Sequence, residues 1–238
     1  MARKIAKKKR GGRPFSNGSG GPGPVITKAR DNGFKIIFGD HNMFADFLRD
    51  FIKIDLFKGV QANDIEDITE RFLPLFQEGR DSDTIKTVRL KGGSTYVMVV
   101  LEHESRVNYR QAFKMLQYIT LFYDHYEKEE NKKSTGASFR KDFKYPAVLP
   151  VVFYDGGGNW TAETNFYNKV ENNVVFARYT PSFEYLVVNL ADYDEKALTK
   201  FGDALSIALI IAKMRWPDFK GLSEKLPEEY WNKVDLPP

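Results

Sequence analysis

Apolar side chains recur at helical spacing in three separate stretches of the chain. Residues 40–52 begin with Asp40, a residue type common at helix caps, and continue with apolar residues three and four apart. Residues 106–126 carry a longer apolar stripe, and residues 194–214 carry a third, which Pro217 ends. The stripe of the middle stretch consists of Tyr109, Phe113, Leu116, Ile119, Tyr123 and Tyr126. The pattern predicts three helices that each bury one face.

Between the first two helices lies a pattern typical of a β-hairpin. Residues 83–90 and 95–102 are both rich in Val, Ile, Thr and Tyr, and a Gly-Gly pair at 92–93 separates them. Glycine adopts the positive φ angles of a two-residue turn at little cost, so the pair predicts the turn. Counting outward from this turn sets Asp83 opposite Glu102.

Two further apolar runs predict single strands. Residues 145–154 read as a buried strand, although Pro146 and Pro150 place its early part at an edge or bulge. Residues 185–190 form the other run. The order of elements is then helix, hairpin, helix, strand, strand and helix. This order predicts an α/β fold in which helices pack on a mixed β-sheet.

The expected hairpin gathers acidic side chains on one face. Cross-strand partners have Cβ atoms about 5 Å apart, which would bring Asp83 and Glu102 together. Glu104 follows Glu102 by two residues and points to the same face if the strand continues. Like charges directly opposite are destabilising, and a divalent metal is the usual compensation. His103 alternates to the other face, which favours a packing role for its ring.

These acids suit a magnesium site for phosphodiester hydrolysis. Mg²⁺ prefers hard oxygen ligands, typically one or two carboxylates completed by waters and phosphate oxygens. Asp83 and Glu102 supply that minimum, and the backbone carbonyl of His103 is within reach of the same ion. Glu104 is expected to orient or deprotonate the attacking water, a role that lysine fills more commonly. A metal held in this way polarises the phosphate and stabilises the leaving oxygen.

Three cations follow the acids at intervals of four residues. Arg106, Arg110 and Lys114 would form one basic ridge on a helix. A basic ridge beside an acidic site suits the backbone of a nucleic acid, which the carboxylates alone would repel. The alternative is pairing with the neighbouring acids or with solvent. Pairing suits Arg106 and Lys114 better, and nucleic-acid contact suits Arg110 better.

Charge separates the first thirty residues from the rest of the chain. Residues 1–30 hold nine of the 36 Lys and Arg and none of the 32 Asp and Glu, which leaves 27 basic and 32 acidic side chains, a net charge of −5, for residues 31–238. The segment is rich in Gly and lacks the apolar core of a secretion signal, so we expect a disordered basic arm. Loose nucleic-acid association and simple solubilisation are equally good interpretations of its charge.

Composition also excludes several classes of protein. The absence of cysteine excludes disulfides, cysteine zinc sites and thiol catalysis, and it is compatible with the cytoplasm, where we expect the protein. No apolar run approaches the ~20 residues that span a bilayer, so no membrane partner is expected. A length of 238 residues fits one domain with appendages. The oligomeric state stays open, with a homodimer among the alternatives.

Several short motifs follow one another in order between Phe38 and Leu190. They are Phe38-Gly-Asp-His41, Phe44-Ala-Asp-Phe-Leu-Arg49, Asp81-Ser-Asp83, Leu101-Glu-His-Glu-Ser105, Val107-Asn-Tyr-Arg110, Met115-Leu-Gln-Tyr118 and Pro150-Val-Val-Phe-Tyr-Asp-Gly156. In residues and order they resemble the Rpn family, the recombination-promoting nucleases also described as transposases of the YhgA-like type. The resemblance implies a Mg²⁺-dependent DNA endonuclease associated with recombination.

The resemblance also implies an architecture and a set of site residues. Residues 31–190 would form the restriction-endonuclease-like fold of the PD-(D/E)XK superfamily, and residues 191–238 a C-terminal helix and tail. Asp83 matches the first acid of the motif and Glu102 the second. Glu104 occupies the third position, where the superfamily usually has Lys and this family Gln. That departure leaves a second hypothesis, an inactive nucleic-acid-binding or interaction protein that retains the fold.

Overall fold

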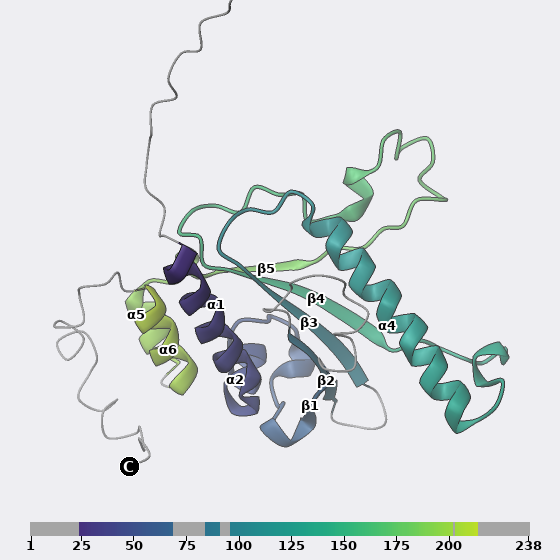
Figure 1. The fold of residues 1–238 in the computed structure, drawn as a ribbon, viewed down its shortest axis with the longest axis horizontal. Helices are drawn as coiled ribbons and strands as arrows, with labels where there is room; N and C mark the ends of the chain where they lie inside the picture. The colour runs from purple at the N-terminus through teal and green to yellow at the C-terminus, as the bar shows by residue number, and fades with distance from the viewer. Residues whose placement is uncertain (1–23, 69–83, 91–95, 202, 214–238) are drawn as a thin grey trace, which may run out of the picture.

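A five-stranded sheet with helices on both faces forms the centre of the protein, as Figure 1 shows for a computed structural model that describes residues 24–68, 84–90, 96–201 and 203–213. The strands are β1 (Ile65–Asp67), β2 (Thr84–Arg89), β3 (Tyr96–Glu104), β4 (Ala147–Tyr154) and β5 (Leu186–Asn189). The α-helices are α1 (Pro24–Gly39), α2 (His41–Asp50), α4 (Gln111–Lys133), α5 (Glu195–Thr199) and α6 (Ala204–Lys213). Short 3₁₀ turns are η1 (Asp55–Phe57), η2 (Ala62–Asp64), η4 (Ala137–Phe139), η5 (Phe166–Lys169) and η6 (Leu190–Asp192).

The sheet is mixed, as the order of elements predicts. Its strands lie in the order β1-β2-β3-β4-β5; β1, β2 and β3 pair antiparallel, and β3, β4 and β5 pair parallel. Parallel neighbours need a long crossover, and α4 supplies it between β3 and β4. β5 pairs with β4 only from Val151 onward, so the early part of β4 with Pro150 has β3 as its described partner. This confirms the edge position expected at Pro150, whereas Pro146 lies just before the strand.

The register of β2 and β3 agrees with the count from the glycine pair. Thr84 lies opposite Leu101, and Arg89 lies opposite Tyr96, with every pair between them in step. The turn at 92–93 and Asp83 lie outside the described residues. The register within the described strands therefore confirms the pairing scheme up to the pair before Asp83 and Glu102.

The larger core lies between the sheet and the layer formed by α1, α2, α5 and α6. Phe153 of β4 is fully buried there, and the rings of Phe34, Phe38 and Phe47 lie 5.1 to 6.2 Å from its ring. Asp40 begins α2 as predicted, because its carboxylate accepts hydrogen bonds from the backbone of Asn42 and Met43. The second core lies between the other face of the sheet and α4, and includes Ile85, Met115, Tyr118, Phe122 and Val152.

Helix α1 occupies part of the range expected to be a disordered arm. It begins at Pro24, so residues 24–30 are helical, and residues 1–23 lie outside the described residues. Proline is favourable in a first helical turn, and the later residues Phe34 and Phe38 bury their rings in the core. The prediction of a disordered arm is therefore wrong for residues 24–30 and stays a prediction for residues 1–23. No helix among the described residues is long and apolar enough to cross a membrane.

The C-terminal stretch forms two helices where the periodicity predicts one. Asp194 caps α5 as predicted, its carboxylate accepting from the backbone of Ala197, and a second cap at Asp203 starts α6. Cap residues compete with helix interiors for backbone hydrogen bonds, which explains the break. Leu198 of α5 and Leu205 of α6 are fully buried in the larger core. These helices therefore complete that core, so the sheet and residues 195–213 share it.

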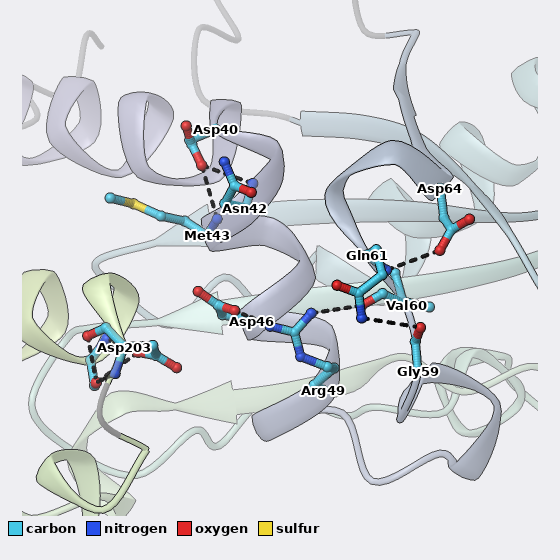
Figure 2. Close-up of polar contacts among 11 residues, drawn as sticks. Asp40, Asn42, Met43, Asp46, Arg49, Gly59, Val60, Gln61, Asp64 and Asp203 are labelled. Atoms are coloured by element: carbon cyan, nitrogen blue, oxygen red, sulfur yellow. Dashed lines mark hydrogen bonds and ion pairs between the residues drawn. The ribbon is translucent and has the colours of Figure 1, made fainter. Parts of the chain in front are cut away.

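Three carboxylates meet where α2 approaches α6. Figure 2 shows Asp46 paired with Arg49 on α2 and Asp203 at the start of α6. Asp50 lies on the same side of α2 as Asp46, and its carboxyl hydrogen-bonds that of Asp203. Partial burial, the hydrogen bond and charge of Asp203 and the charge of Asp46 together raise the pKa of Asp50 to about 7, against the lowering effect of Arg49. The contact between α2 and α6 is therefore most stable when the carboxyl groups of Asp50 and Asp203 share one proton.

We expect Asp50→Asn to stabilise the protein at pH 8 but not at pH 4. The folded state holds a proton that the unfolded chain releases near its ordinary pKa of 3.8, so wild-type stability falls as pH rises from about 4 to about 7. Asparagine keeps a hydrogen bond to Asp203 without the charge, and solvent screening limits the gain to about 1 kcal/mol. Urea unfolding of both proteins at pH 4, 6 and 8 measures it. A constant difference between the two proteins across this range would contradict the shared proton.

Candidate active site

The C-terminal end of β3 carries Glu104 on the side of the sheet that α4 covers. Leu101 is buried in the core on the α1 side, and side chains alternate along a strand, so Glu104 faces α4, and the same alternation predicts this face for Glu102. Their partners on the parallel neighbour β4 are Val152 and Tyr154, which belong to the core beneath α4. The site thus lies at the edge of the sheet where β3 and β4 both end.

The pair expected to hold the metal stands at the limit of the described residues. Glu102 is described by its backbone, which pairs with Val152, while its side chain and the whole of Asp83 lie outside the described set. Extending the β2–β3 register by one pair beyond Thr84 and Leu101 sets Asp83 opposite Glu102. The close approach of the two carboxylates stays a prediction that rests on this register.

Glu104 contacts the first turn of α4. Its Oε1 accepts a hydrogen bond of 3.1 Å from Nδ2 of Asn108 and lies 3.7 Å from Nζ of Lys114. Both charged side chains are mostly buried, with 17% of the Glu104 side chain and 15% of the Lys114 side chain exposed. The pairing alternative considered for Lys114 is therefore present. The ammonium of Lys114, on α4, therefore lies beside Glu104, the residue at the third position of the motif, on β3.

Asn108 and Gln111 belong to this site and were not singled out from the sequence. Asn108 Nδ2 also donates to Oε1 of Gln111, whose side chain is fully buried, so one amide joins Glu104 to α4. Asn108 Oδ1 accepts from the backbone of Arg110, and this turn starts the helix. The sequence does contain a signal for this helix start, because asparagine is a typical helix-capping residue. Beginning the helix after Asn108 would have placed Gln111 and Lys114 beside Glu104.

The basic ridge expected on one helix does not form as predicted. Helix α4 begins at Gln111, so Arg106 lies in the preceding loop and Arg110 is the residue before the first turn. Both arginines are exposed, and only Lys114 is inside the helix. The buried stripe also differs: it contains Ala112, Met115, Tyr118 and Phe122, whereas Tyr109 and Phe113 are exposed. Packing against the sheet therefore buries a different face of α4 from the one that the predicted aromatic stripe occupies.

His103 packs on the far face of the sheet, as its alternation predicts. Its ring lies 4.4 Å from the ring of Phe34 on α1 and is 6% exposed as a residue. Its Nε2 lies 3.1 Å from Oδ1 of buried Asp155 without the alignment of a hydrogen bond. The imidazole therefore cannot reach a metal on the α4 side. A role for His103 in binding metal would have to come from its backbone carbonyl.

Tyr185, Trp160 and Tyr154 form a group of aromatic side chains near Glu104. Tyr185 donates to the backbone carbonyl of Glu163 and accepts from Nε1 of Trp160, whose ring packs edge-on against Tyr154. Burial raises the pKa of Tyr185 to about 12, with the Trp160 hydrogen bond lowering it and the charges of Glu163 and Glu104 raising it. Tyr185 therefore stays protonated at neutral pH and acts as a structural donor.

The donor set fits a hard divalent cation better than a soft one. The acids assigned to the site offer only carboxylate oxygens, which suit Mg²⁺ or Mn²⁺, and the chain has no cysteine. Among the described side chains no three His, Asp or Glu gather in a group that could hold a metal. The expected ligands Asp83 and Glu102 stand outside that set, so the fit rests on their residue types and on the register of the strands that carry them.

The fold is that of a mixed α/β protein, and its central strand β3 carries Glu104 facing the crossover helix α4. The family model described as "Putative transposase, YhgA-like" matches residues 28–235, and the chain belongs to this family. It is 28% identical over 127 residues to "Recombination-promoting nuclease RpnC" of Escherichia coli strain K12, covering 50% of this chain and 38% of the relative. It is 26% identical over 125 residues to "Recombination-promoting nuclease RpnD" of Escherichia coli O157:H7, covering 50% and 44%.

These alignments cover less than half of each nuclease. They support a distant relationship to recombination-promoting nucleases, which is the family expected from the sequence motifs. No solved structure matches the chain. The assignment of a mixed α/β architecture therefore rests on the strand order and helices described above.

Proposed function

We propose that this protein is a Mg²⁺-dependent DNA endonuclease with the restriction-endonuclease-like fold of the PD-(D/E)XK superfamily. The observation that carries the proposal is the β2–β3 register, whose next pair is Asp83 and Glu102 on the face that Glu104 shares. The names of the two nuclease relatives support the same chemistry, and DNA is the substrate class that the family implies. Recombination or transposition is the process to which this activity would belong.

The proposed chemistry divides among residues of three elements. Asp83 on the β2 side and Glu102 on β3 would hold the metal, with the backbone carbonyl of His103 as a further oxygen ligand. A bound Mg²⁺ would polarise the scissile phosphate and activate a water for in-line attack. Glu104 would orient that water, because Asn108 and Lys114 fix its carboxylate at the edge of the sheet.

DNA binding would draw on the loop before α4. Arg106 and Arg110 are exposed there, beside the start of the helix that covers the site. Arginine forks match the geometry of phosphate oxygens, and each phosphate contact releases counterions. Lys114 lies deeper and pairs with Glu104, so it would reach a phosphate only close to the metal. The basic residues 1–23 would add non-specific affinity.

The experiment that tests the proposal is cleavage of supercoiled plasmid by the whole purified chain. Nicked or linear product with Mg²⁺ or Mn²⁺, and none with excess EDTA, is the expected result. Intact plasmid in both divalent ions would contradict the enzyme proposal.

A binding protein without activity is the second candidate. The observation that favours it is Glu104 itself, whose carboxylate is already neutralised by Lys114 at 3.7 Å and hydrogen-bonded to Asn108. A protein of this kind would bind DNA with the usual steep salt dependence and leave the backbone intact. Measuring plasmid binding in the same samples distinguishes the two candidates.

We expect Glu104→Gln to keep cleavage within about tenfold of wild type or to raise it. The glutamine carbonyl still accepts from Asn108, and the loss of the Glu104 charge frees Lys114 to act beside the water. A fall of ~10²-fold or more would show instead that Glu104 accepts a proton in the reaction. Single-turnover plasmid cleavage measures the effect, with Glu195→Gln, an exposed acid in α5 on the other face of the sheet, as the control.

A further inference from the structure

A structured projection leaves the sheet between β4 and β5. It spans residues 165–183, and Figure 1 shows it extending past the first turns of α4, against which its first turn η5 packs. Its two ends are held together by the stacked rings of Phe166 and Phe183, 5.8 Å apart, and by the bridge between Asn165 and Glu184. The projection is therefore anchored at its base and does not merely trail between strands.

Hydrogen bonds within the projection fix its tip. Tyr167 Oη donates to the carbonyl of Asn173, and Nδ2 of Asn173 donates back to the carbonyl of Tyr167. Asn172 adopts a left-handed backbone with φ of 57°, and its carbonyl accepts from Val175 and Phe176. Such a conformation suits asparagine in tight turns. The tip thus has a defined shape before any partner binds.

This rigid tip exposes apolar side chains to water. The exposed fractions are 80% for Val174, 77% for Val175, 54% for Phe176 and 83% for Tyr179. Four large apolar residues within six positions on a projecting turn are unfavourable in water unless they meet a partner. The pre-formed shape and the exposed apolar surface together indicate a contact surface.

The surroundings of the projection favour DNA as the partner. Lys169 and Arg178 are exposed on it against one acid, Glu171. At its approach, Thr161 Oγ1 lies 3.0 Å from Oη of Tyr109, in the loop that carries the exposed Arg106 and Arg110. β3 and β4 run parallel, so the connection after β4 begins at the sheet edge where Glu104 lies. Apolar and cationic groups therefore stand together beside the candidate site.

We propose that the 165–183 projection is a wedge that contacts DNA bases, with Val175 and Phe176 at the minor groove or between base steps and Arg178 on a phosphate. The proposal rests on the proposed nuclease function for its substrate. Proteins that bend DNA often insert apolar side chains between base steps and partly unstack them. A wedge beside the site would hold the duplex distorted where the backbone is cut.

The test compares duplex binding by the whole chain and three variants in Ca²⁺, measured by fluorescence anisotropy over a range of salt. We expect the double variant Val175→Ser/Phe176→Ser to bind about tenfold more weakly, since a stacked base contact is worth ~1–3 kcal/mol. Its salt dependence should match wild type because no phosphate contact is lost. Arg178→Gln should lower the slope of log affinity against log salt by about 1.

The matched control is Phe139→Ser, which removes another exposed phenylalanine, 90% exposed against 54% for Phe176, from η4 at the other end of α4. It should bind as wild type. Equal affinity of the double variant and wild type would overturn the wedge, and cleavage by that variant at wild-type rate would leave the nuclease proposal standing. If wild type is a dimer, and the double variant is a monomer with unchanged affinity for DNA, the projection is a contact between copies of the chain. That result would also overturn the wedge. Failure of wild type both to bind and to cleave DNA would overturn both proposals.

Discussion

Asp83→Ala is expected to lower Mg²⁺-dependent cleavage by about 10³-fold or more, because a metal ligand supplies several kcal/mol of transition-state stabilisation. The thermal stability of the variant should equal or exceed that of wild type. The described register, extended by one pair, would set Asp83 opposite Glu102, so the substitution is expected to remove a repulsive contact along with the ligand. A residue retained for structure behaves in the opposite way, since its truncation typically lowers stability by ~1 kcal/mol or more.

The matched control for this prediction is Asp142→Ala, which removes an acid that is 73% exposed in the loop between η4 and β4. It should cut plasmid at the wild-type rate. Melting curves of both variants in Mg²⁺ and in EDTA complete the comparison. Wild-type cleavage by Asp83→Ala would remove that carboxylate from the proposed metal site.

Lys86→Ala is expected to lower the free energy of unfolding by about 3 kcal/mol. The Lys86 side chain is fully buried on the α1 side of the sheet, where Nζ donates to Asp67 at 3.0 Å and to the carbonyl of Gly39 at 3.1 Å. Its ammonium also lies 5.3 Å from the centroid of the Phe44 ring. Alanine removes the packing of the stem, the carbonyl contact and the partner of a carboxylate at once.

Two comparisons separate the parts of this loss. Lys86→Met keeps the volume and removes the charge, so it should cost clearly less than alanine, because Asp67 is 40% exposed and can turn to water. Lys58→Ala breaks an ion pair of 2.7 Å whose side chains are 77% and 90% exposed, and it should change stability by less than about 0.5 kcal/mol. Denaturant unfolding of the three variants measures the order. Equal stability of Lys86→Ala and Lys58→Ala would contradict the burial of Lys86.

The parts of the fold that sequence predicted depend on local rules. Counting outward from the glycine pair at 92–93 predicted the register of β2 and β3, and alternation predicted that His103 faces away from Glu104. Asp40 and Asp194 cap helices where the pattern expected them. Each of these inferences depends only on neighbours in sequence or on one strand pairing. Contacts between distant segments therefore had little effect on them.

The parts that sequence missed depend on contacts between distant segments. Helix α1 forms in a stretch read as arm because Phe34 and Phe38 find Phe153, more than a hundred residues away. The buried face of α4 was misassigned because the sheet selects Met115 over the exposed Phe113. The contact of Glu104 with Lys114 follows from where α4 begins, which helical periodicity alone does not locate.

Asp83 and Glu102 are proposed to hold one divalent ion between β2 and β3. The most direct measurement is anomalous diffraction at the manganese edge from crystals of the whole chain grown with Mn²⁺. We expect one strong peak on the α4 side of the sheet, with carboxylate oxygens of both residues at about 2.1–2.2 Å, a distance close to the ~2.0–2.1 Å of Mg²⁺. Asp83 and Glu102 on opposite faces of the sheet, or no manganese between them, would contradict it.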